Sequence, residues 1–135
     1  MTRREYSENT APYDLAVLAT LVGEDPAVVA ETLDLFVRVA REWLADSAQA
    51  RAAGDRRALG RLAHRMRSSA HAIGARPLAK ACTDSEAIAG SGDVAGALAA
   101  AAHAEAVLGA LLTALAAEPA CHASKASSET GRENR

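Results

Sequence analysis

The chain has 135 residues, the size of one ordinary domain. Half of its residues are hydrophobic but only 3% are aromatic, a balance that favours closely packed helices over a sheet. A formal net charge of −2 argues against a protein whose overall charge attracts nucleic acid or an anionic membrane. Cys82 and Cys121 have neither metal-ligand spacing nor the pattern of a disulfide framework, so we expect a reducing compartment, the cytoplasm.

Five helices are predicted between two polar ends. Aspartates that can cap a helix mark several starts, one of them followed by proline at the first helical position, and glycines mark the ends. The predicted helices run over about residues 13–22, 26–53, 56–74, 77–90 and 94–115. We expect a flexible N-terminus over residues 1–11, a helical domain over 12–117, and a disordered tail over 118–135, which has little apolar content.

Each of three long helices carries a clear apolar stripe. Four long helices with short connections predict an all-α protein, an antiparallel up-down four-helix bundle, with the short N-terminal helix covering one end. We expect a monomer, since the stripes can bury one another. The last helix comes nearest to a membrane span, but His103 and Glu105 interrupt it, so no membrane is expected. The stripes are Val29, Leu33, Phe36, Ala40 and Trp43; Leu59, Leu62, Met66, Ala70 and Ile73; and Val94, Leu98, Ala101, Leu108, Leu111 and Leu115.

One histidine is predicted to lie on the exposed side of the third helix. A helix turns about 100° per residue, so His64 lies roughly 170° from the centre of the stripe on its own helix. An exposed imidazole is largely neutral at pH 7 and keeps one nitrogen lone pair for attack on an electrophile. His64 is therefore a candidate nucleophile.

The side chains around His64 suit a phosphoryl group. Arg67 lies three residues on, on the same face, and a guanidinium donates paired hydrogen bonds to phosphate oxygens. Ser68 is small enough to let another domain approach, and its hydroxyl can donate a hydrogen bond. Arg61 and His71 extend the positive face. The pattern indicates a phosphoryl acceptor, because phosphoryl transfer depends mainly on positioning and charge stabilisation.

The segment from Ala63 to Ala75 resembles the signature of histidine-containing phosphotransfer (HPt) domains. That signature runs roughly Ala-His-x-Leu-Lys-Gly-Ser-Ala, and then an aliphatic residue followed by Gly-Ala; this chain has Ala-His-Arg-Met-Arg-Ser-Ser-Ala and Ile-Gly-Ala. The likeness extends over about residues 13–115. It implies that His64 is the phosphorylated residue and that Arg67 keeps the charge of the family's usual lysine. Ser68 stands where the family usually has glycine.

The resemblance implies a phosphocarrier in a multistep two-component phosphorelay. His64 would accept a phosphoryl group from the aspartate of a receiver domain, in a hybrid histidine kinase or a response regulator, and pass it to a receiver aspartate. Arg67 would steady the phosphoryl oxygens. The chain shows no nucleotide-binding motif and no carboxylate cluster beside His64, so we expect no kinase activity and no cofactor of its own, with Mg²⁺ in the receiver. The residues expected to shape the docking surface are Arg61, Arg65, Ser68 and His71.

The same residues allow other interpretations. The main alternative is a non-catalytic docking module with the same bundle, motivated by Ser68. The arginines beside the histidine would also suit nucleic acid, but the chain is net acidic and nearly lacks stacking aromatic residues. His71 is a weaker acceptor because the motif does not centre on it. His64 and His71 are too far apart to share a metal, and no carboxylate or thiol is expected to join them on this face. Trp43 and Cys82 are predicted to be core residues.

Overall fold

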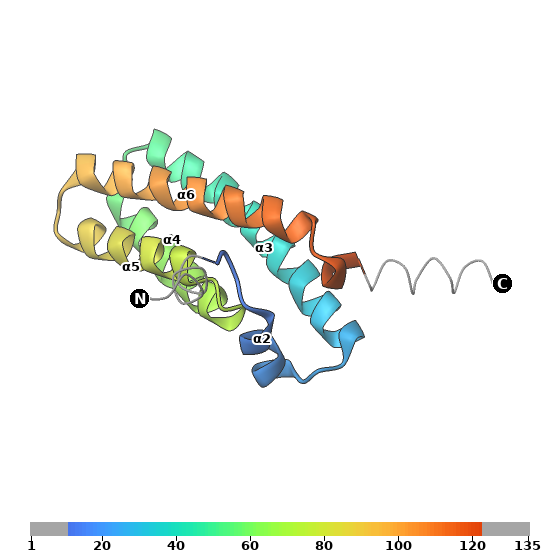
Figure 1. Cartoon of the computed structure of the whole chain (residues 1–135). Coiled ribbons are helices and arrows are strands. Elements are labelled where there is room, and N and C mark those ends of the chain that lie inside the picture. Colours follow the sequence, from blue (N-terminus) through green and yellow to red (C-terminus); the bar gives the residue numbers. More distant parts are fainter. Residues whose placement is uncertain (1–10, 123–135) are drawn as a thin grey trace.

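A computed structural model of the chain describes residues 11–122, and these residues form helices only. Four of the helices are long, and Figure 1 shows them side by side, each reversing the direction of the one before, with the short helix at one end of the bundle. The predicted all-α bundle is confirmed, with helix ends within about two residues of their expected places. The helices are α2 (Leu15–Val22), α3 (Pro26–Ala52), α4 (Arg56–Ala72), α5 (Arg76–Gly90), α6 (Val94–Ala116) and the 3₁₀ helix η1 (Pro119–His122).

Aspartates start four of these helices. In each case the carboxylate accepts a hydrogen bond from a backbone N–H of the first turn, at 2.9–3.0 Å. Such a bond satisfies a donor that has no partner within the helix, and the negative charge suits the positive end of the helix dipole. The capping residues are Asp14, Asp25, Asp55 and Asp93.

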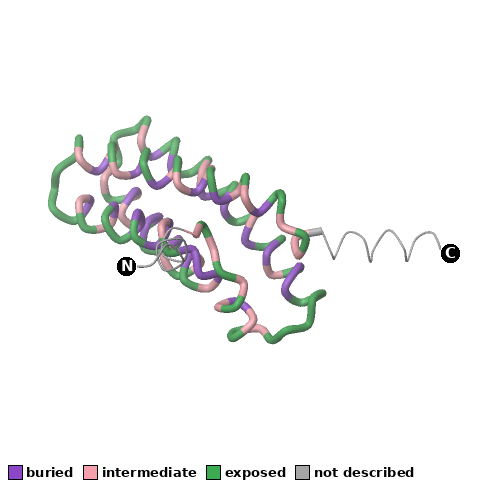
Figure 2. Tube along the Cα trace, viewed as in Figure 1, coloured by how far each residue is buried: buried purple, intermediate pink, exposed green. Residues whose placement is uncertain are grey.

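The stripes predicted for α3 and α4 are buried in full, as the purple inner faces in Figure 2 show. Trp43 lies in the core as expected, and its indole N–H donates a 2.8 Å hydrogen bond to the carbonyl of Leu62. The apolar stripe predicted for α6 is wrong at its first residue. Val94 is 46% exposed, because it begins α6 at an end of the bundle where residues 90–95 are all exposed. Leu98, one turn later, is half-buried.

By length and composition, α6 is the one described helix that could cross a membrane. Here its leucines Leu108, Leu111 and Leu115 are buried in the bundle. Its Glu105 accepts a 2.9 Å hydrogen bond from the buried hydroxyl of Ser47, and another of 2.9 Å from the Arg51 guanidinium. In this structure α6 is thus a core helix that a polar network ties to α3.

The start of the disordered tail is predicted too early in the chain. Residues 118–122, expected to be disordered, belong to the described structure, and Ala120 and Cys121 pack against the core. The hydroxyl of Tyr13 donates a 3.0 Å hydrogen bond to Glu118, and burial together with this bond raises the pKa of Tyr13 to about 12. The other residues of the predicted flexible N-terminus and disordered tail, 1–10 and 123–135, lie outside the described residues.

The N-terminal segment crosses the end of α4 at Gly74. The backbone N–H of Asp14 donates a 2.9 Å hydrogen bond to the carbonyl of Ile73. Gly74 has a φ of +64°, and a Cβ placed on it would lie 2.7 Å from the Cβ and 2.9 Å from the carbonyl oxygen of Asp14. The glycine of the Ile-Gly-Ala segment is therefore required by both backbone conformation and close approach.

We predict that Gly74→Ala lowers the free energy of unfolding more than Gly54→Ala does. Gly54 has the same φ of +64°, but a Cβ there meets nothing within 4 Å. Both changes carry the left-handed cost of about 1–2 kcal/mol, and only Gly74→Ala adds the clash with Asp14. Urea unfolding of both variants measures the difference. An equal loss of unfolding free energy in the two variants would contradict the role assigned to the close contact between Gly74 and Asp14.

Candidate functional site

His64 lies in the middle of α4 and faces solvent, as its distance from the apolar stripe predicts. Its side chain is 64% exposed. The residues on either side of it in the helix, Leu62, Ala63 and Met66, are buried. Because these neighbours fix the rotation of α4 against the core, the imidazole is held on the outer face of the bundle.

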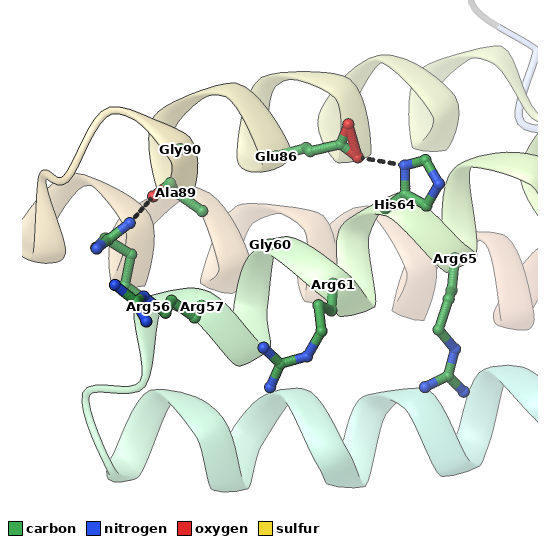
Figure 3. A pocket seen from close by; sticks show the side chains of 9 residues that line it. All are labelled: Arg56, Arg57, Gly60, Arg61, His64, Arg65, Glu86, Ala89 and Gly90. Atoms are coloured by element: carbon green, nitrogen blue, oxygen red, sulfur yellow. Dashed lines mark hydrogen bonds and ion pairs between the residues drawn. The ribbon is translucent and has the colours of Figure 1, made fainter.

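A carboxylate that the sequence analysis did not anticipate contacts this histidine. Glu86 of α5 lies with its Oε2 2.8 Å from Nδ1 of His64, as Figure 3 shows. An ionised carboxylate only accepts hydrogen bonds, so in the neutral ring the proton lies on Nδ1, and this N–H donates a hydrogen bond to Glu86. The lone pair is then on Nε2. The sequence predicted no carboxylate joining His64 and His71 on this face; Glu86 comes from the neighbouring helix α5 and contacts His64.

The sequence did contain a signal for Glu86. Cys82, Ser85 and Ala89 form the buried face of α5, so Glu86, next to Ser85, flanks that face. Which neighbouring helix it meets depends on how α5 rotates against α4, and no spacing within one helix encodes this. The two residues are 22 positions apart in the chain.

Glu86 also reaches the predicted phosphate-binding arginine. Its second oxygen lies 3.6 Å from Nη1 of Arg67, and the two side chains are 32% and 35% exposed. One carboxylate thus lies between an imidazole and a guanidinium. Beneath them Cys82 is fully buried, as predicted. Burial raises the pKa of the Cys82 thiol to about 11, with Arg67 opposing and Glu86 adding to the rise, so this cysteine is a poor nucleophile.

The other predicted site residues also belong to α4, but the side chains of Arg61 and Arg65 extend towards α3, away from Glu86 (Figure 3). Arg61, Arg65, Ser68 and His71 are all exposed. Within residues 11–122 none of the four has a hydrogen bond or ion pair to His64 through its side chain, and His71 lies two turns along the helix. The structure therefore places them around His64 as free surface groups. Among the described residues no group of three or more His, Cys, Asp or Glu side chains could hold a metal ion.

A groove of about 590 Å³ runs between α4 and α5 from the histidine towards the far end of both helices. Figure 3 shows His64 and Glu86 at one end, Gly60 and Ala89 in the middle, and Arg56 near the other end. We call it the α4–α5 groove. Its lining residues are Arg56, Arg57, Gly60, Arg61, His64, Arg65, Glu86, Ala89 and Gly90.

The fold and the site together define a class: helical bundles that present a histidine, oriented by a carboxylate, on an open face. The chain belongs to the Hpt domain family, because the model of that family matches residues 31–118. It is also similar to a solved structure, histidine-containing phosphotransfer protein B (HptB) from Pseudomonas aeruginosa PAO1. The two chains are 29% identical with a TM-score of 0.67, over 76% of this chain and 89% of that one.

A search of curated proteins found no match. Membership in the family gives the chain a histidine phosphotransfer role in phosphorelays. Hpt proteins are phosphocarriers rather than kinases, and they interact with receiver domains.

We predict that Glu86 sets the tautomer of His64. In the wild type the neutral ring of His64 should be protonated mainly at Nδ1, and Glu86→Ala should shift protonation towards Nε2, because the acceptor at Nδ1 is lost. ¹⁵N-edited NMR of the imidazole nitrogens above neutral pH measures the tautomer ratio. His71, exposed on the same helix, is the control within each sample and should not change. An unchanged ratio at His64 would contradict the assignment.

Proposed function

We propose that His64 is the phosphoryl acceptor, taking the group from the aspartate of a receiver domain and passing it to a receiver aspartate. The observation that carries the proposal is the 2.8 Å contact between Nδ1 of His64 and Glu86, on a side chain that is 64% exposed. It leaves the lone pair on Nε2, and the exposure of the ring allows a partner to bring phosphorus to it.

The transfer follows from this arrangement. The Nε2 lone pair attacks the phosphorus of an aspartyl phosphate, the bond from phosphorus to the aspartate oxygen breaks, and the aspartate leaves as a carboxylate. The ring now carries a positive charge with its proton still on Nδ1. The Nδ1–H group donates a charge-assisted hydrogen bond to the carboxylate of Glu86, which stabilises the positive ring while the proton stays on Nδ1. In the onward step an aspartate of a receiver attacks the phosphorus, the bond to Nε2 breaks, and neutral His64 is restored.

Arg67 is the proposed ligand of the phosphoryl oxygens. At 3.6 Å from Glu86 it is held close to His64 without a short ion pair, so its guanidinium can turn to the phosphoryl group when that arrives. Ser68, exposed one turn from His64, adds a hydroxyl donor at the same edge. Arg61, Arg65 and His71 form the rest of the docking surface, where positive charge suits the acidic site of a receiver.

The magnesium ion of the aspartate chemistry is assigned to the receiver, because carboxylate clusters of the kind that hold Mg²⁺ are not found among the described residues. We propose that the chain acts as a monomer in the cytoplasm, partnered by a receiver of a hybrid kinase or of a response regulator. No nucleic acid or membrane takes part in this scheme.

A docking module without transfer is the second candidate. Ser68, in place of the usual glycine, puts a side chain on the surface that a receiver must approach to reach Nε2. Such a module would bind receivers and never carry phosphate. The two candidates differ in whether His64 is ever modified.

We predict that phosphoramidate adds one phosphoryl group to the wild-type chain and none to His64→Gln. Intact mass is read at neutral to basic pH, because phosphohistidine is lost in acid. His71→Gln is the matched control and should be modified like the wild type. An adduct that survives in His64→Gln would contradict the assignment. Absence of any adduct, from phosphoramidate or from several receivers, would favour the docking module, with Ser68→Gly as the variant to restore transfer.

We predict that Arg67→Ala slows phosphoryl transfer from a receiver by about ten- to a hundredfold, the worth of one hydrogen bond to a charged group. Stopped-flow or quench-flow labelling measures the rate. Arg41→Ala, which removes an exposed arginine of α3, is the control and should leave the rate unchanged. A wild-type rate in Arg67→Ala would remove Arg67 from the transfer step.

A further inference from the structure

Most of the α4–α5 groove takes no part in the proposed transfer chemistry at His64. It begins at His64 and Glu86 and extends about two turns of α4 towards Arg56. A domain that brings an aspartyl phosphate to Nε2 has to contact the His64 end of this groove, because His64 itself is part of the lining. The rest of the groove is thus next to the surface that the partner contacts at the moment of transfer.

Small residues create the groove. A Cβ on Gly60 would lie 3.2 Å from the Cβ of Ala89, so α4 and α5 approach closely at this level. Next to Ala89, Gly90 adds no side chain, and a Cβ there would meet nothing within 4 Å. The space between the helices is thus bounded by backbone, methyl groups and the methylene stems of arginines, which suits an apolar side chain.

Arginines of α4 line one side of this apolar space. Arg56 is held in place by a 2.6 Å hydrogen bond from its guanidinium to the carbonyl of Ala89. Arg57, Arg61 and Arg65 have no ion pair within residues 11–122. The one carboxylate in the lining, Glu86, is already bound to His64 and near Arg67. The excess positive charge at the rim calls for carboxylates from the partner.

We propose that the α4–α5 groove is a specificity site for the receiver domain, and that it takes an apolar side chain flanked by acidic groups on the receiver surface. This inference rests on the proposed function, since it identifies the surface chemistry of the partner at the same site. It gives Arg57 and Gly90 a part in choosing the partner and none in the chemistry at Nε2.

The test compares two phosphoryl donors. Phosphoramidate needs no docking, whereas a receiver does. The receiver probe is chosen from a panel of purified, phosphorylated receiver domains as the one that labels the wild-type chain fastest. Gly90→Leu fills the groove, and Arg57→Glu reverses a rim charge. Their matched controls are Gly109→Leu in α6, where an added Cβ also meets nothing within 4 Å, and Arg41→Glu on α3.

We expect Gly90→Leu and Arg57→Glu to slow labelling by the receiver about tenfold or more, with labelling by phosphoramidate unchanged. Both controls should match the wild type with both donors. Raising the ionic strength should slow labelling by the receiver more for the wild type than for Arg57→Glu. Salt screens the attraction between Arg57 and acidic groups of the receiver, and the variant lacks that attraction already.

Each other result would overturn the proposal in its own way. If a receiver labels both groove variants at the wild-type rate, the receiver does not recognise the groove. Loss of phosphoramidate labelling as well would show that the groove acts on the chemistry of His64 and not on docking. If neither phosphoramidate nor any receiver labels the wild type, the proposed function fails and the groove assignment fails with it.

Discussion

The close approach of α4 and α5 is the constraint on which the site depends. Gly60 of α4 lies against Ala89 of α5, and a side chain on Gly60 would press on that methyl group at 3.2 Å. This contact sets how near the two helices lie, and one turn along it brings Glu86 within hydrogen-bond distance of His64. The same approach leaves the groove beside the histidine. The orientation of the imidazole and the shape of the α4–α5 groove are thus two results of one packing contact.

Much of this arrangement can be predicted from residue spacing. The stripes of α3 and α4 follow from apolar residues three and four positions apart, and aspartates mark where helices begin. The exposure of His64 follows from its place opposite the stripe. These features are local, since each depends on residues within a few turns of one helix. The acceptor role of His64 stays a prediction, supported by the family to which the chain belongs.

The features that spacing missed depend on contacts between distant segments. Glu86 meets His64 only because α5 rotates one flank towards α4, and Tyr13 donates its hydrogen bond to Glu118, which is 105 positions away in the chain. The structure of residues 118–122 has the same origin, since Ala120 and Cys121 are partly buried by packing against the core. Val94 fits the periodicity of α6 yet is exposed, because a pattern does not tell where the neighbouring helices end.

The single tryptophan of the chain, Trp43, contacts α4 from the core side. Its indole N–H donates to the carbonyl of Leu62, two residues before His64 on the opposite side of the same helix. The emission of a buried indole changes with its hydrogen bonding and its exposure to water. Trp43 is therefore a built-in optical reporter of the helix that presents the histidine, and it lets local loosening of α4 be followed in solution without any added label.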